Sequence, residues 1–171
     1  MKRPLLAGAA TAILLFCAAT GRLILWPTSG MPTHVSAIVM LAGPGARLSE
    51  AVRLAKDHRA SFLAISRGHD GYGSPCPASV PRVRLICFDP VPASTRGEAE
   101  FVGRLARTYH WRSLVLVTNI AQDSRARERM ERCFPGRVYV VTVPVPLASW
   151  PGRIAYEWAA TLKMWLIQPG C

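Results

Sequence analysis

The chain has 171 residues, half of them hydrophobic, which is enough for one domain with a hydrophobic core plus a short additional segment. A net charge of +11, from 21 Lys and Arg against 10 Asp and Glu, favours anionic partners such as phosphates, acidic lipid head groups or acidic polymers. Nucleic acid is not expected as a partner, because there is no zinc-finger spacing, no aromatic-rich basic strand and no basic tail.

The N-terminus carries a candidate membrane anchor. Lys2 and Arg3 precede an uncharged, mostly apolar run from Pro4 to Gly21, which is close to the length of a membrane-spanning helix. The basic pair predicts that the N-terminus is cytoplasmic and that the rest is exported. A cleaved signal peptide is the competing interpretation, because small residues follow Phe16. We therefore expect a single-pass membrane anchor over residues 1–26, a linker over 27–34 and a folded domain over 35–171 that is located outside the cytoplasm.

The expected topology determines the environment of the five cysteines. One lies in the anchor, and four lie in the domain that we expect to be exported, where an oxidising compartment permits two disulfides. Three connectivities are possible, and buried free thiols are the alternative. No pair has the CxxC spacing, so metal or redox chemistry is not indicated and no metal site is expected. The candidate disulfide residues are Cys76, Cys87, Cys133 and Cys171.

Strands and helices are expected to alternate along the domain. Apolar runs predict five strands, and segments with apolar residues at helical spacing predict the helices between and after them. The expected strands are 36–42, 60–66, 83–88, 113–118 and 137–143; the expected helices are 47–58, 94–109, an arginine-rich helix after Asn119, and 148–167. Residues 67–81 contain three glycines and three prolines and are expected to form a loop in place of a helix.

This alternation predicts an α/β fold. Near-continuous apolar strands indicate a mostly parallel sheet covered by helices on both faces, a Rossmann-like arrangement of about five strands preceded by the N-terminal helix. Ligands of such folds bind beyond the carboxyl ends of the strands. The residues that follow those ends form our candidate ligand-binding set: Gly43, Gly45, Arg47, Gly68, Asp89, Thr95, Glu98, Thr118, Asn119, Gln122 and Arg125.

Each of these positions also has a plainer interpretation. Thr95 and Glu98 match a capping box, in which Thr95 caps the helix and Glu98 reaches back to its start. His69 and Asp70 are expected to be loop residues and not a catalytic pair. Arg125 lies near the first turn of its helix, where a cation opposes the helix dipole unless an anion is bound. It is expected either to bind an anion or to pair with Asp89 or Glu98 and hold the loops.

The other arginines of that helix are expected to lie on its solvated face, paired in part with neighbouring glutamates. They are Arg127, Arg129 and Arg132. Replacing any of them singly by alanine is expected to change stability by less than about 0.5 kcal/mol.

Several of these segments together resemble the YdcF/SanA/ElyC family of bacterial envelope proteins. The similar segments are "AIVMLAGPGARLSEAVRLA", "FLAISRG", "DPVPASTRGEA" and "LVLVTNIAQDSRA", in that order, between about residues 37 and 143. Two positions depart from the family pattern: Arg67 replaces a glycine, and Gln122 stands where the family has a histidine. The usual helix between the second and third strands is also replaced by the Gly/Pro loop.

The resemblance implies a role in envelope biogenesis. It implies a membrane-anchored extracytoplasmic factor that binds or processes an anionic ligand, of the phosphate-bearing or lipid-carrier-linked kind. Gln122 cannot act as a general base near neutral pH, so the alternative is a non-catalytic module that binds an anion or a partner at the membrane surface. The sequence identifies no cofactor and no reaction.

Overall fold

In the computed structural model, residues 2–27, 30–68 and 75–171 are described. Five parallel strands form one sheet in the order β3-β2-β1-β4-β5. The strands are β1 (Val35–Met40), β2 (Ala60–Ser66), β3 (Arg84–Phe88), β4 (Ser113–Asn119) and β5 (Arg137–Val143). The predicted α/β, Rossmann-like fold is therefore confirmed, and the strand order reverses between β1 and β4, where such sheets open a crevice.

Helices cover both faces of the sheet. On one face, α3 (Thr95–Thr108) and α4 (Asp123–Cys133) bury apolar residues such as Val102 and Met130 against Val39 and Leu116. On the other face, α2 (Arg47–Lys56) packs Leu54 against the opposite side of the same strands. Because successive strand residues point to opposite faces, a strand covered on both sides must be apolar at nearly every position.

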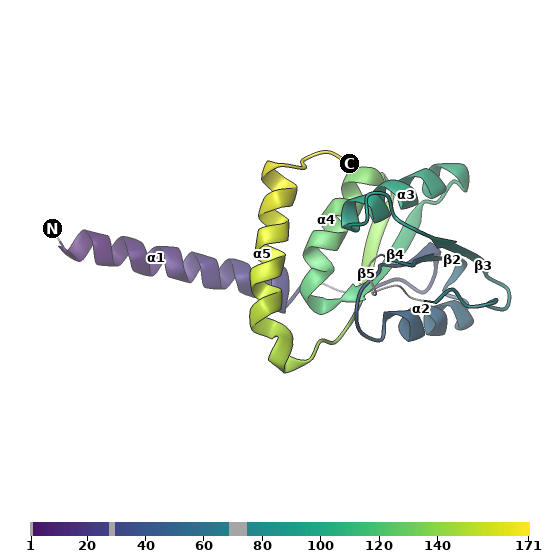
Figure 1. Cartoon of the computed structure of the whole chain (residues 1–171), viewed down its shortest axis with the longest axis horizontal. Coiled ribbons are helices and arrows are strands. Elements are labelled where there is room, and N and C mark those ends of the chain that lie inside the picture. The colour runs from purple at the N-terminus through teal and green to yellow at the C-terminus, as the bar shows by residue number, and fades with distance from the viewer. Residues whose placement is uncertain (1, 28–29, 69–74) are drawn as a thin grey trace.

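The last helix, α5 (Trp150–Leu166), does not cover the sheet face. It follows a single 3-10 turn, η3 (Leu147–Ser149), and packs beside α4 and the 3-10 turn η2 (Ile120–Gln122) (Figure 1). The connection from β2 to β3 contains no helix in its described residues, as the sequence predicts. His69 and Asp70 lie outside the described residues, as do Thr28 and Ser29 of the expected linker.

The N-terminal helix α1 (Lys2–Thr20) projects from the domain beside α5 (Figure 1). It continues into a short π-helical segment, η1 (Gly21–Leu25), which contacts α4 and η2 and buries Ile24. Apolar side chains of α1 are largely exposed, among them Leu14 at 70% and Leu15 at 66%. By length and composition, the helix is long and apolar enough to span a membrane.

Two cysteine pairs lie at disulfide distance. Cys76 pairs with Cys87 at the end of β3, and Cys133 at the end of α4 pairs with the C-terminal Cys171. Among the three connectivities left open by the sequence, the structure thus selects the one that joins neighbours in chain order. Cys17, on α1, is free and exposed.

Candidate functional site

A cleft of about 500 Å³ lies at the carboxyl ends of the strands. It is bounded by the loops after β1 and β2, the N-terminus of α3, the turn after β4, and α5. Its lining residues are Ala42, Gly43, Pro44, Arg47, Gly68, Pro90, Ala93, Ser94, Thr95, Glu98, Asn119, Gln122, Arg125, Arg153, Tyr156 and Glu157.

Most of the predicted site residues meet in this cleft. Eight line it, namely Gly43, Arg47, Gly68, Thr95, Glu98, Asn119, Gln122 and Arg125. The remaining three do not. A Cβ added at Gly45 would meet the side chain of Val143 at the end of β5. Asp89 is exposed and pairs with Arg67, and Thr118 is buried beneath Gln122.

Arg47 forms the floor of the cleft. Its side chain is almost fully buried, and Nη1 donates to the carbonyl oxygens of Leu41 and Ala42, while Nη2 donates to Gln122 Oε1 at 3.2 Å. Burial lowers the pKa of the guanidinium to about 10, with Glu98 opposing the shift, so Arg47 stays charged at neutral pH. Its Nε has no hydrogen-bond partner among the described residues.

Gly43 makes room for this arginine. Its backbone has a φ of +135°, and a Cβ placed there would lie 2.8 Å from the Arg47 guanidinium. The glycine is therefore required both by the left-handed backbone and by the close approach of Arg47. The turn after β1 is shaped around a buried cation.

Glu98 is the buried acid of the cleft. Its Oε1 accepts from the backbone N–H of Ala42 at 2.7 Å, which ties α3 to the turn after β1. Burial raises the pKa of this carboxyl, while the Ala42 N–H, Ser66 and the charges of Arg47 and Arg125 act in the opposite direction. A buried carboxyl with a raised pKa in a strand-end cleft is a candidate functional group.

The predicted capping box is wrong. Ser94, one residue earlier, is the N-cap of α3 and accepts from the N–H of Gly97, and Thr95 is the first helical residue. Glu98 does not reach back to the start of its own helix, because it bonds to Ala42 on the β1 turn instead. The Thr95 hydroxyl accepts from Gln122 Nε2 and Arg125 Nη1, at 3.1 and 3.2 Å.

Gln122 ties together three parts of the cleft. Its Oε1 accepts from Arg47 and from the Thr118 hydroxyl, its Nε2 donates to Thr95, and its backbone N–H donates to Asn119 Oδ1. Every polar atom of the side chain is thus engaged. The residue holds the loops in place, and it offers no basic nitrogen to a ligand.

Helix α5 supplies a wall that the sequence did not predict. Arg153, Tyr156 and Glu157 line the cleft from this helix. Arg125 pairs with Glu157, and not with Asp89 or Glu98, the partners named in one of the two alternatives that the sequence left open. The signal for it was a single acid within the apolar segment "RIAYEWAATL", because an isolated charge in a buried helix requires a partner.

Arg153 differs from the other two arginines of the cleft. Within the described residues, its guanidinium bonds only through Nε, which donates to Ser149 Oγ at 3.1 Å. Three guanidinium groups and two carboxyls therefore face one cleft, beside the N-terminus of α3, whose first N–H groups have no partner within the helix. The balance of charge favours an anion.

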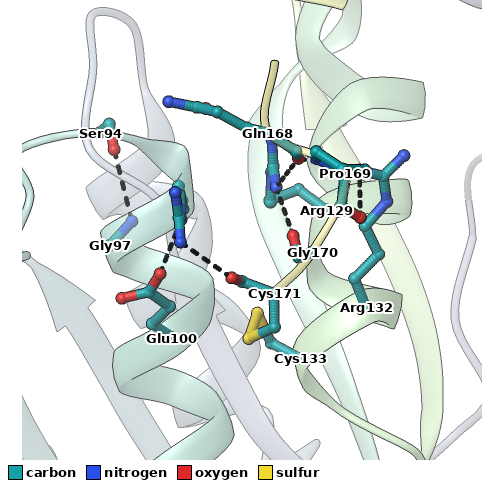
Figure 2. Close-up of polar contacts among 11 residues, drawn as sticks. Ser94, Gly97, Glu100, Arg129, Arg132, Cys133, Gln168, Pro169, Gly170 and Cys171 are labelled. Atoms are coloured by element: carbon teal, nitrogen blue, oxygen red, sulfur yellow. Dashed lines mark hydrogen bonds and ion pairs between the residues drawn. A yellow bond between two sulfur atoms is a disulfide. The ribbon is translucent and has the colours of Figure 1, made fainter. Parts of the chain in front are cut away.

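The predicted solvated face of α4 is wrong for two arginines. Arg129 is 3% exposed, and its Nη1 donates to the carbonyl oxygens of Gln168 and Gly170 at 2.8 Å each. Arg132 donates to the carbonyls of Gln168 and Pro169 (Figure 2). It also donates to the carbonyl of Met164. Arg127 is half-buried and donates to Val138 O on β5.

The C-terminal residues 168–171 are therefore held against α4. The bond between Cys133 and Cys171 fastens the same segment, and Arg96 of α3 donates to a backbone oxygen of Cys171 (Figure 2). Arg96, Arg129 and Arg132 therefore hold the C-terminal segment in place. The arginines that line the cleft are Arg47, Arg125 and Arg153. In the described part of the chain, no three His, Cys, Asp or Glu side chains are grouped so as to hold a metal ion.

Comparison with known protein families finds no family model that matches this chain. No curated protein sequence matches it either. Among solved structures, the chain is similar to the pantoate–β-alanine (pantothenate synthetase) structure from Thermus thermophilus, with 15% identity and a TM-score of 0.34, over 82% of this chain and 73% of that chain. This similarity is too distant to bear on function.

Proposed function

We propose that this protein is a membrane-anchored extracytoplasmic factor in bacterial cell-envelope biogenesis that binds an anionic ligand in the strand-end cleft. The observation that carries the proposal is the position of Arg153 in the cleft beside the N-terminus of α3, where its guanidinium bonds to the described residues only through Nε. Arg47 lines the same cleft and adds a positive charge, while Arg125 is already paired with Glu157. A phosphate or a carboxylate is the group that such a set of donors recognises. The resemblance to the YdcF/SanA/ElyC family supports a phosphate-bearing or lipid-carrier-linked ligand.

The location of the protein rests on two observations. Helix α1 exposes apolar side chains such as Leu14 and Phe16, as a helix in lipid would. The two cysteine pairs at disulfide distance favour an oxidising compartment. An export-dependent reporter fused after Cys171 is expected to be active; activity of a cytoplasmic reporter at that position would contradict the topology.

Binding without catalysis is the alternative that the bonding of Gln122 favours. Its side chain is fully engaged with Arg47, Thr118 and Thr95, so no base takes the place of the family's histidine there. If the ligand is processed, Glu98 is the candidate acid or base, because this carboxyl lines the cleft and burial raises its pKa. An assay for the release of phosphate from a short-chain polyprenyl pyrophosphate distinguishes processing from binding alone. Turnover by the parent chain that is lost in Glu98→Gln supports processing. Binding of the pyrophosphate without turnover supports a non-catalytic binding module.

The binding test uses the full chain in mild detergent, with inorganic phosphate and pyrophosphate as probes. Arg153 is the residue to replace, because Arg47 and Arg125 are tied into the fold, whereas among the described residues Arg153 bonds only to Ser149. Arg153→Ala is expected to weaken binding by about tenfold or more, as loss of a charge-assisted contact would. The matched control is Arg107→Ala, which removes one exposed positive charge from α3. Equal binding by both variants, or no binding by the parent chain, would refute the anion site.

A further inference from the structure

We infer that the outer face of α5 lies on the surface of the lipid bilayer, as a second membrane contact beside α1. The inference rests on the part of the proposed function that places α1 across the membrane. It concerns a different helix and a different face of the molecule from the cleft.

The outer face of α5 is apolar and exposed. Ala155, Ala159, Leu162 and Leu166 follow one another at intervals of four, three and four residues, which places them on one stripe of the helix. All four are exposed, Leu166 at 77%. The opposite side of the helix carries Glu157 and Met164, which are buried against the domain.

The lipid surface is the occupant that the surroundings favour. Figure 1 shows α1 leaving the domain on the side where α5 forms the boundary, and α5 running crosswise to it. A bilayer crossed by α1 would therefore have its surface along α5. The two helices are also in direct contact: the rings of Phe16 and Trp158 stack with centroids 5.3 Å apart, and Trp158 Nε1 donates to the Thr20 hydroxyl at 2.9 Å. The apolar surface of α1 thus continues onto α5.

The length of α1 fits this placement. The 17 uncharged residues from Pro4 to Thr20 rise about 26 Å at 1.5 Å per residue, near the hydrocarbon thickness of roughly 30 Å. The next segment, η1, is already packed against α4 and η2. The bilayer surface is therefore reached at the point where Thr20 meets α5.

The composition of α5 is that of an interfacial helix. Leu162, Leu166 and Trp165 lie at its exposed surface, with Lys163 exposed beside them, where anionic head groups attract a cation. Its acid, Glu157, points inward to Arg125 and does not oppose that attraction. Because Arg153, Tyr156 and Glu157 of the same helix line the cleft, the cleft would open within about one helix diameter, roughly 10 Å, of the lipid.

Depth-dependent quenching in the full chain tests the inference. Single fluorescent labels are placed on Leu162→Cys, Leu166→Cys and Arg107→Cys in a Cys17→Ala background, and on the native Cys17 of the parent chain. Each protein is reconstituted in nanodiscs that contain anionic lipid brominated high on the acyl chain. The four paired cysteines remain oxidised throughout.

Labels at positions 162 and 166 are expected to be quenched several-fold more than the label on α3, at a depth of about 5–10 Å into the boundary region. Strong quenching at Cys17 with no quenching on α5 would overturn this inference and leave the anchor standing. No quenching at Cys17 would overturn the anchor and this inference with it. Labels on α5 that escape the lipid quencher yet show self-quenching between copies would overturn it in favour of a second copy of the chain.

Discussion

Arg125 of α4 and Glu157 of α5 form a two-point ion pair, with Nε 2.6 Å from Oε2 and Nη2 3.2 Å from Oε1. Their side chains are 10% and 5% exposed. The third nitrogen, Nη1, donates to the Thr95 hydroxyl. The pair thus joins the last helix of the chain to the strand-end cleft, and a ligand would meet a guanidinium that is already neutralised.

Replacing Arg125 with alanine is therefore expected to lower stability by about 3–5 kcal/mol, because it leaves Glu157 buried without a partner. Denaturant unfolding of the full chain in detergent measures the loss. The double variant Arg125→Met, Glu157→Leu is expected to recover much of it, since no unpaired charge remains. A loss below about 0.5 kcal/mol combined with loss of pyrophosphate binding would instead assign Arg125 to the ligand.

Arg129→Ala is expected to lower stability by about 1.5–3 kcal/mol, because two carbonyls near the C-terminus lose a charged donor. The sequence pattern alone predicts a change within about 0.5 kcal/mol, which holds for exposed residues. Arg107→Ala on α3 is the control and should stay within that limit. Equal effects of the two substitutions would show that the contacts of Arg129 to Gln168 and Gly170 contribute nothing.

The strands could be predicted because a strand that is buried on both faces is apolar at nearly every position, and such a run is visible in the sequence. The apolar run of β1 reads directly as a strand, and the residues after each strand end locate the cleft by topology alone. Arg129 could not be placed in this way, because its partners are backbone carbonyls about 40 residues further along the chain, which leave no side-chain signature. The wall formed by α5 was missed for a similar reason, since the strand-end rule considers only loops that follow strands.

The capping box failed for a different reason. Thr95 and Glu98 have the right spacing, yet a local pattern does not reveal that Ala42 offers Glu98 an N–H from another loop. Tertiary contact decided between Ser94 and Thr95 as the cap. The positions could be predicted as site residues, while their bonding could not.

Stability is expected to depend on pH through Asp123. Its carboxyl is fully buried, Oδ2 has no hydrogen-bond partner among the described residues, and burial raises its pKa from 3.8 to about 6, against the charges of Arg127 and Arg22. Because the folded state then binds the proton more tightly than the unfolded state, this group stabilises the fold below about pH 4, and that contribution is lost as the pH rises through about 6.

Asp123→Asn is expected to remove this part of the pH dependence. The difference in unfolding free energy between parent and variant should change by about 2–3 kcal/mol between pH 4 and pH 7, with the parent losing stability relative to the variant as the pH rises. Taking the difference cancels Glu98, whose pKa is raised in both proteins. A difference that stays constant over this range would show that Asp123 titrates with its ordinary pKa.

Protein isolated from its native compartment should contain both disulfides. Two bridges remove two hydrogens each, so the unreduced mass is expected to fall four hydrogens below that of the reduced chain.

Cys171→Ser opens the bridge that closes 38 residues of chain between α4 and the C-terminus, and is expected to lower the free energy of unfolding by about 2–4 kcal/mol. Cys17→Ser alters the free cysteine of α1 and serves as the control, with the four-hydrogen deficit intact and stability unchanged. Adding reductant should lower the stability of the parent chain and of Cys17→Ser, and should affect Cys171→Ser less, because only the Cys76–Cys87 bridge remains in that variant. Four free thiols in the isolated protein would contradict both the bridges and the exported location of the domain.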